Sequence, residues 1–427
     1  DSQGIFLMTR GLLAAFFLVG VLFMIYKFGD YLNFKIVLVV FIFLSTIFSI
    51  HALLDANLGA HGFPDAMSLM TYASDVVTDG WDTINPLAIS HEATIPTAYN
   101  YFSSYPFQVG CFLYFVLVFK LFGAWNVFAL EMINIIANEV TILALIGMSW
   151  QITVSKRLRI ASIIAASSSV PFLISASFPY GNSVGFAFTC LFLWAQLSSL
   201  KANSAAKKTT WQVFSFVPLT FGMIIKPTFV LVALGVLAAR VIDAFLRKQW
   251  LQLVVTICIV FLADFMVGLP TTWIENKLQL DFGDGIPSSA WIEIGLSESE
   301  NLNGQPGWWD PTALENYTST DGDYAVQDIL AKKGIQKAIY AFIQDPLYFF
   351  NFMSTKLSTE WTEPTYQSLM FYGLNTDSNG TLTGYTSYQS IPITAYMRGY
   401  QIVLYVGFFL ETLLVFYRGK KCVDASY

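Results

Sequence analysis

The stretch IVLVVFIFLSTIFSIHALL, residues 36–54, decides the class of fold to which this chain belongs. It contains no charged side chain, and a helix of this length comes close to the roughly 30 Å thickness of a bilayer's hydrocarbon core. The whole chain shares this character, since 55% of its 427 residues are hydrophobic and only 12% are charged. A soluble domain carries about 25% charged residues. The composition therefore predicts an integral membrane protein.

Further apolar stretches of spanning length, about 17–25 residues, recur along the chain. The stretch 107–122 is borderline and predicts either a short span or a helix lying in the membrane interface. The other predicted spans are 5–26, 36–54, 127–150, 160–178, 183–200, 211–225, 228–245, 250–270 and 399–417. We therefore expect an all-α polytopic membrane protein, a helical bundle of about nine to ten spans.

The distribution of lysine and arginine predicts the topology, because cytoplasmic loops are enriched in these residues. Basic residues gather in short loops such as SKRLR, residues 155–159, whereas residues 55–106 hold six acids and no lysine or arginine. Residues 271–397 are also rich in acids. If the basic loops are cytoplasmic, both acidic loops lie outside, and 107–122 must then be a membrane-embedded helix that does not cross. We expect a multi-pass plasma-membrane protein with two large extracytoplasmic loops.

These loops and spans divide the chain into three expected parts. Residues 1–270 form a transmembrane module with the first outer loop at 55–126, residues 271–397 form a second outer loop domain, and residues 398–427 form the last span and a cytoplasmic tail. Turn-forming residues, as in ENLNGQPGWWDP (300–311), predict that the second loop is compact and irregular. It also contains a helical pattern at 323–346, ended by Pro346.

Charge and ligand chemistry exclude several classes of protein. The net charge of −6 argues against nucleic-acid binding, which needs a basic surface. The histidines His51, His61 and His91 are scattered without ligand spacing, and the four cysteines form no metal-binding or disulfide pattern. The sequence therefore predicts neither a metal nor a cofactor.

The stretch FPDAMSLMTYASDVVTDG, residues 63–80, holds the first candidate for chemistry. Ala66, Leu69, Met70, Ala73, Val76 and Val77 recur at helical spacing and predict a short amphipathic helix on the membrane surface. Asp65 opens this helix. It either caps the helix or presents a carboxylate to the bundle that accepts a proton, and the two roles are compatible.

The order of several motifs resembles the first outer loop of GT-C fold glycosyltransferases, which include the protein O-mannosyltransferases and the lipid A aminoarabinose transferase. Those motifs are Pro64-Asp65-Ala66, Tyr105-Pro106-Phe107 and Phe122-Gly123. The pair Lys226-Pro227 resembles a mid-chain pair in the Gram-positive bacterial membrane proteins of this type. The resemblance covers about residues 36–270.

The resemblance implies an inverting transfer of a sugar from a polyprenyl-phosphate donor to a hydroxyl-bearing acceptor outside the cell, which is a cell-envelope polymer, a glycolipid or a protein. Asp65 would be the catalytic base. Membrane lipid surrounds the site, and a membrane-protein partner is possible. The substrate-binding residues implied are Lys226 on the donor phosphate, together with Asn182, Tyr105, Tyr180, Arg398 and Trp308.

Some of these residues have competing explanations. Lys226 and Arg398 could instead snorkel to the membrane surface, and Trp308 could belong to the core of its own loop. Many relatives carry an acid in the outer turn SFPYGNSVG, residues 177–185, where this chain has Asn182. Asparagine can position an acceptor but cannot act as a base.

Two other functions remain open at this point. A lipid or polysaccharide transporter usually shows polar residues in several spans, and this chain has few: Glu131, Glu139, Asp243 and Asp264. A non-catalytic scaffold of a cell-envelope glycosylation complex is the other alternative, which the departure at Asn182 keeps open.

Overall fold

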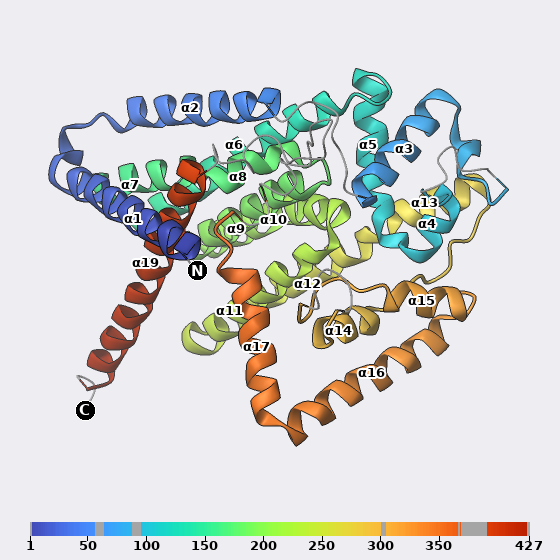
Figure 1. Cartoon of the computed structure of the whole chain (residues 1–427). Helices are drawn as coiled ribbons and strands as arrows, with labels where there is room; N and C mark the ends of the chain where they lie inside the picture. The colour runs from blue at the N-terminus through green and yellow to red at the C-terminus, as the bar shows by residue number, and fades with distance from the viewer. Residues whose placement is uncertain are drawn as a thin grey trace. The chain divides into compact units, whose positions relative to one another are not determined.

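The computed structural model describes residues 2–55, 64–87, 95–299, 305–365, 368 and 391–424. This described part is helical (Figure 1), and its one β pairing is an isolated bridge between Glu298 and Pro306. Six of its helical segments are long and apolar enough to cross a membrane, or up to eight if each of two bent helix pairs counts as one span. The six are Met8–Tyr31, Phe34–Leu54, Val127–Ile152, Asn182–Lys201, Pro227–Arg247 and Trp250–Leu278. The chain is a multi-pass helical membrane protein.

The remaining predicted spans also fall on helices. The stretch 160–178 lies largely on the bent pair Lys156–Ser167 and Val170–Ser177, whose axes meet at 46°. The stretches 211–225 and 399–417 lie within α10 (Ala205–Ile225) and α19 (Ile391–Asp424). The number of nine to ten crossings stays a prediction.

The chain folds into two compact units, and each combines segments that are far apart in the sequence. The first unit takes its described residues from Asp1–Ala60, Leu145–Ser177 and Glu363–Tyr427. The second unit takes them from His61–Ala144 and Phe178–Thr362. Helix α6 (Val127–Ile152) begins in the second unit and ends in the first.

The first unit is held together by close helix contacts. Its main helices are α1 (Ser2–Phe28), α2 (Phe34–Asp55), α7 (Lys156–Ser167), α8 (Val170–Ile174) and α19. Gly399 of α19 faces Ala14 of α1 so closely that a Cβ atom at Gly399 would lie 2.7 Å from that side chain. The hydroxyl of Tyr400 donates to the carbonyl of Ala165 on α7 at 2.6 Å. Glycine at the first contact is therefore needed for the approach of α1 and α19.

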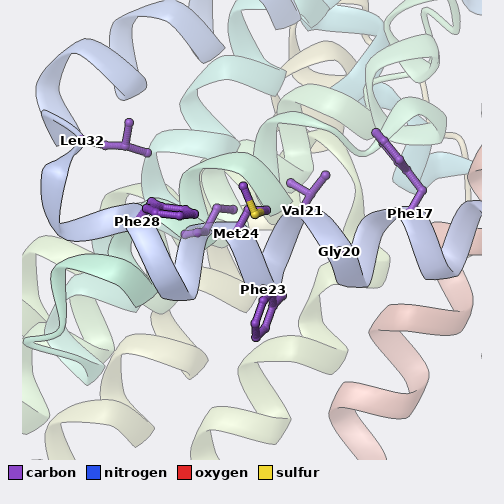
Figure 2. Close-up of a pocket in the computed structure, with 8 residues that line it drawn as sticks. Phe17, Gly20, Val21, Phe23, Met24, Phe28 and Leu32 are labelled. Carbon is purple, nitrogen blue, oxygen red and sulfur yellow. The ribbon is translucent and has the colours of Figure 1, made fainter.

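A shallow apolar hollow runs along α1, and Figure 2 shows the side chains around it. All its lining residues lie between Phe17 and Leu32, and none of them is charged. Exposed apolar side chains on a spanning helix are the surface that a lipid tail or another apolar helix covers. The hollow contains none of the residues that the sequence nominates for chemistry.

The second unit contains a bundle of four long helices, α9 (Asn182–Lys201), α10, α11 (Val230–Arg247) and α12 (Trp250–Val267). Helix α10 packs against both α9 and α12, and α11 packs against α12. Their shared core is apolar: Phe192, Leu219, Met223, Ala233, Ile259, Val260 and Ala263. The four helices therefore pack around one apolar core in the second unit.

A buried polar network also joins three of these helices, α9, α10 and α11. The guanidinium of Arg240 on α11 donates to the side-chain oxygen of Gln196 on α9 at 2.8 and 3.2 Å and to its backbone oxygen at 3.1 Å. Gln196 in turn donates to Ser215 on α10 at 2.8 Å. A charge inside a membrane span is costly unless it is hydrogen-bonded. The glutamine therefore compensates the burial of Arg240.

The outer part of the second unit begins with the expected amphipathic helix, α3 (Pro64–Thr78). Its predicted face is buried at Ala66, Leu69, Met70, Ala73 and Val76, as expected. This face, however, packs against α5 (Val109–Phe122) rather than only lying on a membrane surface. Figure 1 shows α3, α5 and α13 (Leu269–Leu278) close together at one end of this unit.

Helix α5 is the borderline segment 107–122. It follows α4 (Ala98–Ser104) after a bend of 110° at Tyr105. The residue before a proline is disfavoured in helical geometry, and Tyr105 has φ −131° and ψ 61° before Pro106. Helix α5 has 14 residues, so it is about 21 Å long, shorter than the bilayer core. Helices α4 and α5 together are apolar enough to count as one bent span, so whether α5 crosses the membrane stays a prediction.

The second outer loop is more helical than the sequence indicates, although the described residues 305–311 of the turn-rich stretch lie outside helices, as expected. Between Leu269 and Trp361 the described residues form α13, α14 (Ser288–Leu296), α15 (Thr312–Ser319), α16 (Tyr324–Gln344) and α17 (Pro346–Trp361). The helix expected at 323–346 is confirmed as α16. Acids cap two of these helices: the Asp323 carboxylate accepts from the Val326 amide at the start of α16, and Asp345 accepts from backbone amides at the start of α17 before Pro346. Acids and prolines are typical of helix starts as well as of turns.

Candidate functional site

Asp65 is held by two tyrosine hydroxyls of the second unit. Tyr101 of α4 donates to Oδ1 at 3.3 Å, and Tyr180, just before α9, donates to Oδ2 at 2.9 Å. Both tyrosines are buried, and Asp65 is partly buried. Each carboxylate oxygen can accept more than one bond, so the side chain is fixed in orientation yet able to accept a further donor.

The side chain of Asp65 does not cap α3. Among the described residues no backbone amide donates to this carboxylate, whose hydrogen bonds go to Tyr101 and Tyr180. Asp65 is the second residue of α3, where the positive end of the helix dipole still favours a negative charge. Of the two roles that the sequence allows, the geometry favours a carboxylate that faces other side chains.

Tyr180 is the centre of the site. Its hydroxyl donates to Asp65 and accepts a hydrogen bond from Nε2 of Gln108. Its ring lies under the ammonium of Lys226, with Nζ 3.7 Å from the ring centroid. Burial, followed by the negative charge of Asp65, raises the pKa of Tyr180 well above its ordinary value. The hydroxyl therefore stays protonated and keeps its role as a donor.

A glycine turn positions Tyr180. Gly181 adopts the left-handed conformation, with φ +74°, and a Cβ atom there would lie 2.6 Å from Cγ2 of Ile225. The turn thus brings the Tyr180 segment against the end of α10. The carbonyl of Tyr180 also accepts from Sγ of Cys111 at 3.8 Å, and the carbonyl of Phe178 accepts from Asn134 at 3.2 Å. These contacts limit the movement of the tyrosine.

The break between α10 and α11 positions Lys226. Helix α10 ends at Ile225, Lys226 is extended with φ −144° and ψ 94°, and Pro227 begins a short 3₁₀ turn. Helix α5 passes very close, because a Cβ atom at Gly110 would lie only 2.0 Å from the carbonyl oxygen of Ile224. Burial lowers the pKa of Lys226 below its ordinary value, and the charge of Asp65 opposes this shift.

Two charged side chains, Asp65 and Lys226, contact Tyr180 and do not contact each other. Asp65 contacts the hydroxyl of Tyr180 and Lys226 contacts the face of its ring. In the described part of the chain, no ion pair within 4.0 Å joins Asp65 to Lys226. A carboxylate and an ammonium are thus available together in one partly buried place.

The other nominated residues lie in several places. The ring of Tyr105 packs against Tyr101 at 5.2 Å and Trp291 at 6.3 Å between ring centroids, next to the site. Asn182 is the first residue of α9, two positions after Tyr180, and is exposed.

Two further nominated residues lie elsewhere. Nε1 of Trp308 donates to Thr359 of α17 at 3.3 Å, within the second outer loop. Arg398 belongs to the first unit, where its aliphatic carbons pack against Gly11.

Sequence reasoning missed Tyr101 and Gln108 as members of the site. Tyr101 lies four residues before Tyr105 and so shares its helix face, which was an available signal. Gln108 carries no such signal.

In the part of the chain that the structure describes, no three His, Cys, Asp or Glu side chains are grouped so that they could hold an ion. His61 and His91 lie outside the described residues, and His51 is exposed.

Comparisons with protein families, with curated protein sequences and with solved structures found no match to this chain. What the fold and the site define is a multi-pass helical membrane protein with a carboxylate–tyrosine–lysine group between α3, α5 and the α10–α11 break.

Proposed function

We propose that this protein is a GT-C-type glycosyltransferase that moves a sugar from a polyprenyl-phosphate donor to an extracytoplasmic hydroxyl acceptor. The observation that carries the proposal is the meeting of Asp65 and Lys226 on the two sides of Tyr180. The resemblance of the flanking motifs to GT-C enzymes supports it from the sequence.

The reaction assigns a role to each charge. The acceptor hydroxyl loses its proton to the Asp65 carboxylate while its oxygen bonds to the anomeric carbon of the sugar. The bond from that carbon to the phosphate oxygen breaks, and its electron pair leaves with the lipid phosphate. A single displacement of this kind inverts the anomeric centre. A positioned general base contributes roughly 10²–10⁴ in rate.

Lys226 suits the leaving phosphate. An ammonium stabilises the negative charge that grows on the phosphate oxygen as the bond breaks. Lys226 lies at a helix break beside the apolar segment Pro227–Arg247, so the isoprenoid tail of the donor can remain in lipid while its phosphate reaches the ammonium. We assign contact with the sugar or the acceptor to Asn182, two positions after Tyr180, and to Tyr105, whose ring packs against Tyr101.

The test compares an acid at the start of α3 with an acid just after its end. Asp65→Asn removes the base with little change in shape, and Asp79→Asn alters an exposed acid just after the C-terminus of α3 and serves as the matched control. Wild-type protein purified in lipid is analysed by mass spectrometry for bound polyprenyl-phosphate sugar, and that lipid is then used as the donor in a transfer assay.

We expect all three proteins to retain the lipid. Asp65→Asn should lose transfer by roughly 10² or more, whereas Asp79→Asn should match the wild type. Transfer by Asp65→Asn at the wild-type rate would overturn the proposal. A lipid or polysaccharide transporter, or a scaffold of a glycosylation complex, would be indifferent to Asp65→Asn, so the same comparison separates the transferase from these two alternatives.

A further inference from the structure

Two opposite charges share one aromatic side chain in this site. The carboxylate of Asp65 contacts the hydroxyl of Tyr180, and the ammonium of Lys226 lies over the face of the ring. The attraction between opposite charges is much stronger in a partly buried place than in water. Lysine also carries its charge on a flexible stem. Direct contact between the two groups is therefore the arrangement that electrostatics alone would favour.

The structure shows separate groups instead, and Tyr180 accounts for this. Its ring offers the ammonium a cation–π contact, which is favourable for a desolvated cation. Its hydroxyl offers the carboxylate a hydrogen bond, and Gln108 holds that hydroxyl from its other side. Tyr101 donates to the second carboxylate oxygen and restrains it further.

The backbone of Tyr180 is also restrained. Gly181 is confined to a left-handed turn against Ile225, and the neighbouring carbonyl of Phe178 accepts from Asn134 of α6. The carbonyl of Tyr180 itself accepts from Cys111. Both the side chain and the backbone of Tyr180 are therefore restrained, as a residue that keeps two charged groups apart requires.

We propose that Tyr180 is a positioning residue that holds Asp65 and Lys226 apart, so that neither charge is neutralised by the other. If the two groups closed into an ion pair, the carboxylate would lose its capacity as a base and the ammonium its capacity to bind a phosphate. The consequence for transfer rests on the proposed function, whereas the separation of the charges does not.

Two variants divide the role of the tyrosine. Tyr180→Phe keeps the ring under Lys226 and removes the bond to Asp65. Tyr180→Leu removes both contacts and leaves the charges free to meet. With the co-purified lipid as donor, we expect Tyr180→Phe to lower kcat about tenfold with the KM for the donor unchanged. We expect Tyr180→Leu to lower kcat further and to raise the KM for the donor to that of Lys226→Met.

A rescue measurement follows from the same reasoning. In the Tyr180→Leu background, Asp65→Asn removes the partner that neutralises Lys226 and should return the binding of the lipid donor to the wild-type level. In the wild-type background Asp65→Asn should leave that binding unchanged. A residue that served only the stability of the fold would show no such recovery.

Measurements that do not depend on sugar transfer test this proposal separately from the proposed function. Thermal unfolding is measured for Asp65→Asn, Lys226→Met and the double variant in the wild-type and Tyr180→Leu backgrounds. The shifts in Tm should add in the wild type and fail to add in Tyr180→Leu, and cryo-EM of Tyr180→Leu should show Lys226 Nζ in contact with Asp65.

Opposite results overturn the proposal. One is that in Tyr180→Leu the Tm shifts of Asp65→Asn and Lys226→Met add and the two side chains stay apart. The other is that in Tyr180→Phe the KM for the donor rises as much as in Lys226→Met. The second result decides the question even if Tyr180→Leu does not fold. An absence of any sugar transfer by wild-type protein would instead defeat the proposed function and leave the thermal arm standing.

Discussion

The approach of α5 to α10 makes a sharp prediction at Gly110. This buried glycine is the second residue of α5, and a Cβ atom there would lie 2.0 Å from the carbonyl oxygen of Ile224 and 2.9 Å from its carbonyl carbon. Ordinary contact begins near 3.4 Å. In Gly110→Ala the two backbones must therefore separate by about 1.4 Å, and backbone atoms cannot rotate out of the way as a side chain can.

The size of the effect follows from two opposed terms. Overpacking of a core costs about 1–3 kcal/mol, and a backbone clash belongs at the upper end of that range. Alanine gains about 1 kcal/mol over glycine in helix propensity. We expect Gly110→Ala to lose about 2 kcal/mol of unfolding free energy, which is roughly 4–8 °C in Tm for a unit of this size. Because Ile224 lies two residues before Lys226, donor binding should fall as well.

Thermal unfolding in detergent measures this effect, with Gly235→Ala as the matched control. Gly235 lies on α11, and no atom lies within 4 Å of the Cβ position there. Only the propensity term applies, so Gly235→Ala should have a Tm equal to or above that of the wild type. A Gly110→Ala variant as stable as Gly235→Ala would refute the close contact between α5 and the end of α10.

Other predictions concern charges. Gln196→Leu removes the two hydrogen bonds from the buried guanidinium of Arg240 to the side-chain oxygen of Gln196, keeps the one to its backbone oxygen, and should cost about 3 kcal/mol. The double variant Gln196→Leu/Arg240→Met should recover most of this loss in thermal unfolding. Burial lowers the pKa of Lys226 below its ordinary 10.5, so transfer that needs the ammonium should be complete below the lowered pKa and lost as the pH rises through it. Lys226→Arg should remove this alkaline loss from the pH profile of kcat/KM, because a guanidinium stays charged. The pair of Arg157 and Asp30 has side chains 36% and 51% exposed, and exposed ion pairs contribute little to stability. Arg157→Met should therefore leave Tm almost unchanged, and a clear fall in Tm would contradict that.

The class of fold was readable from the sequence because it depends on additive properties of neighbouring residues. The apolar stretches predicted spanning helices, and the 3.6-residue period predicted the buried face of α3. The second outer loop was read only in part. The helical pattern predicted α16, but α14 and α15 were not predicted, because Pro287 and Pro311 before them are compatible with turns as well as with helix starts.

The candidate site was partly readable. Asp65 and Lys226 stood out because charged groups are rare in so apolar a chain, and the structure brings both to Tyr180. The hydrogen bonds that organise them were not readable, since they join residues 36 and 115 positions apart in the chain. The resemblance nominated Tyr180 as a substrate-binding residue, but nothing in the local sequence indicates that it contacts both Asp65 and Lys226.

The sequence by itself determined that this chain resides in a membrane as a set of helices. It also singled out Asp65 and Lys226 as candidates for chemistry. Hydrophobicity and helical period are properties of short segments, so they can be read without knowing how the rest of the chain folds. Only the tertiary structure decided which segments form each compact unit and which tyrosine separates the aspartate from the lysine. Those choices depend on how α5 and α10 pack and on the left-handed turn at Gly181, which exist only once distant segments have come together.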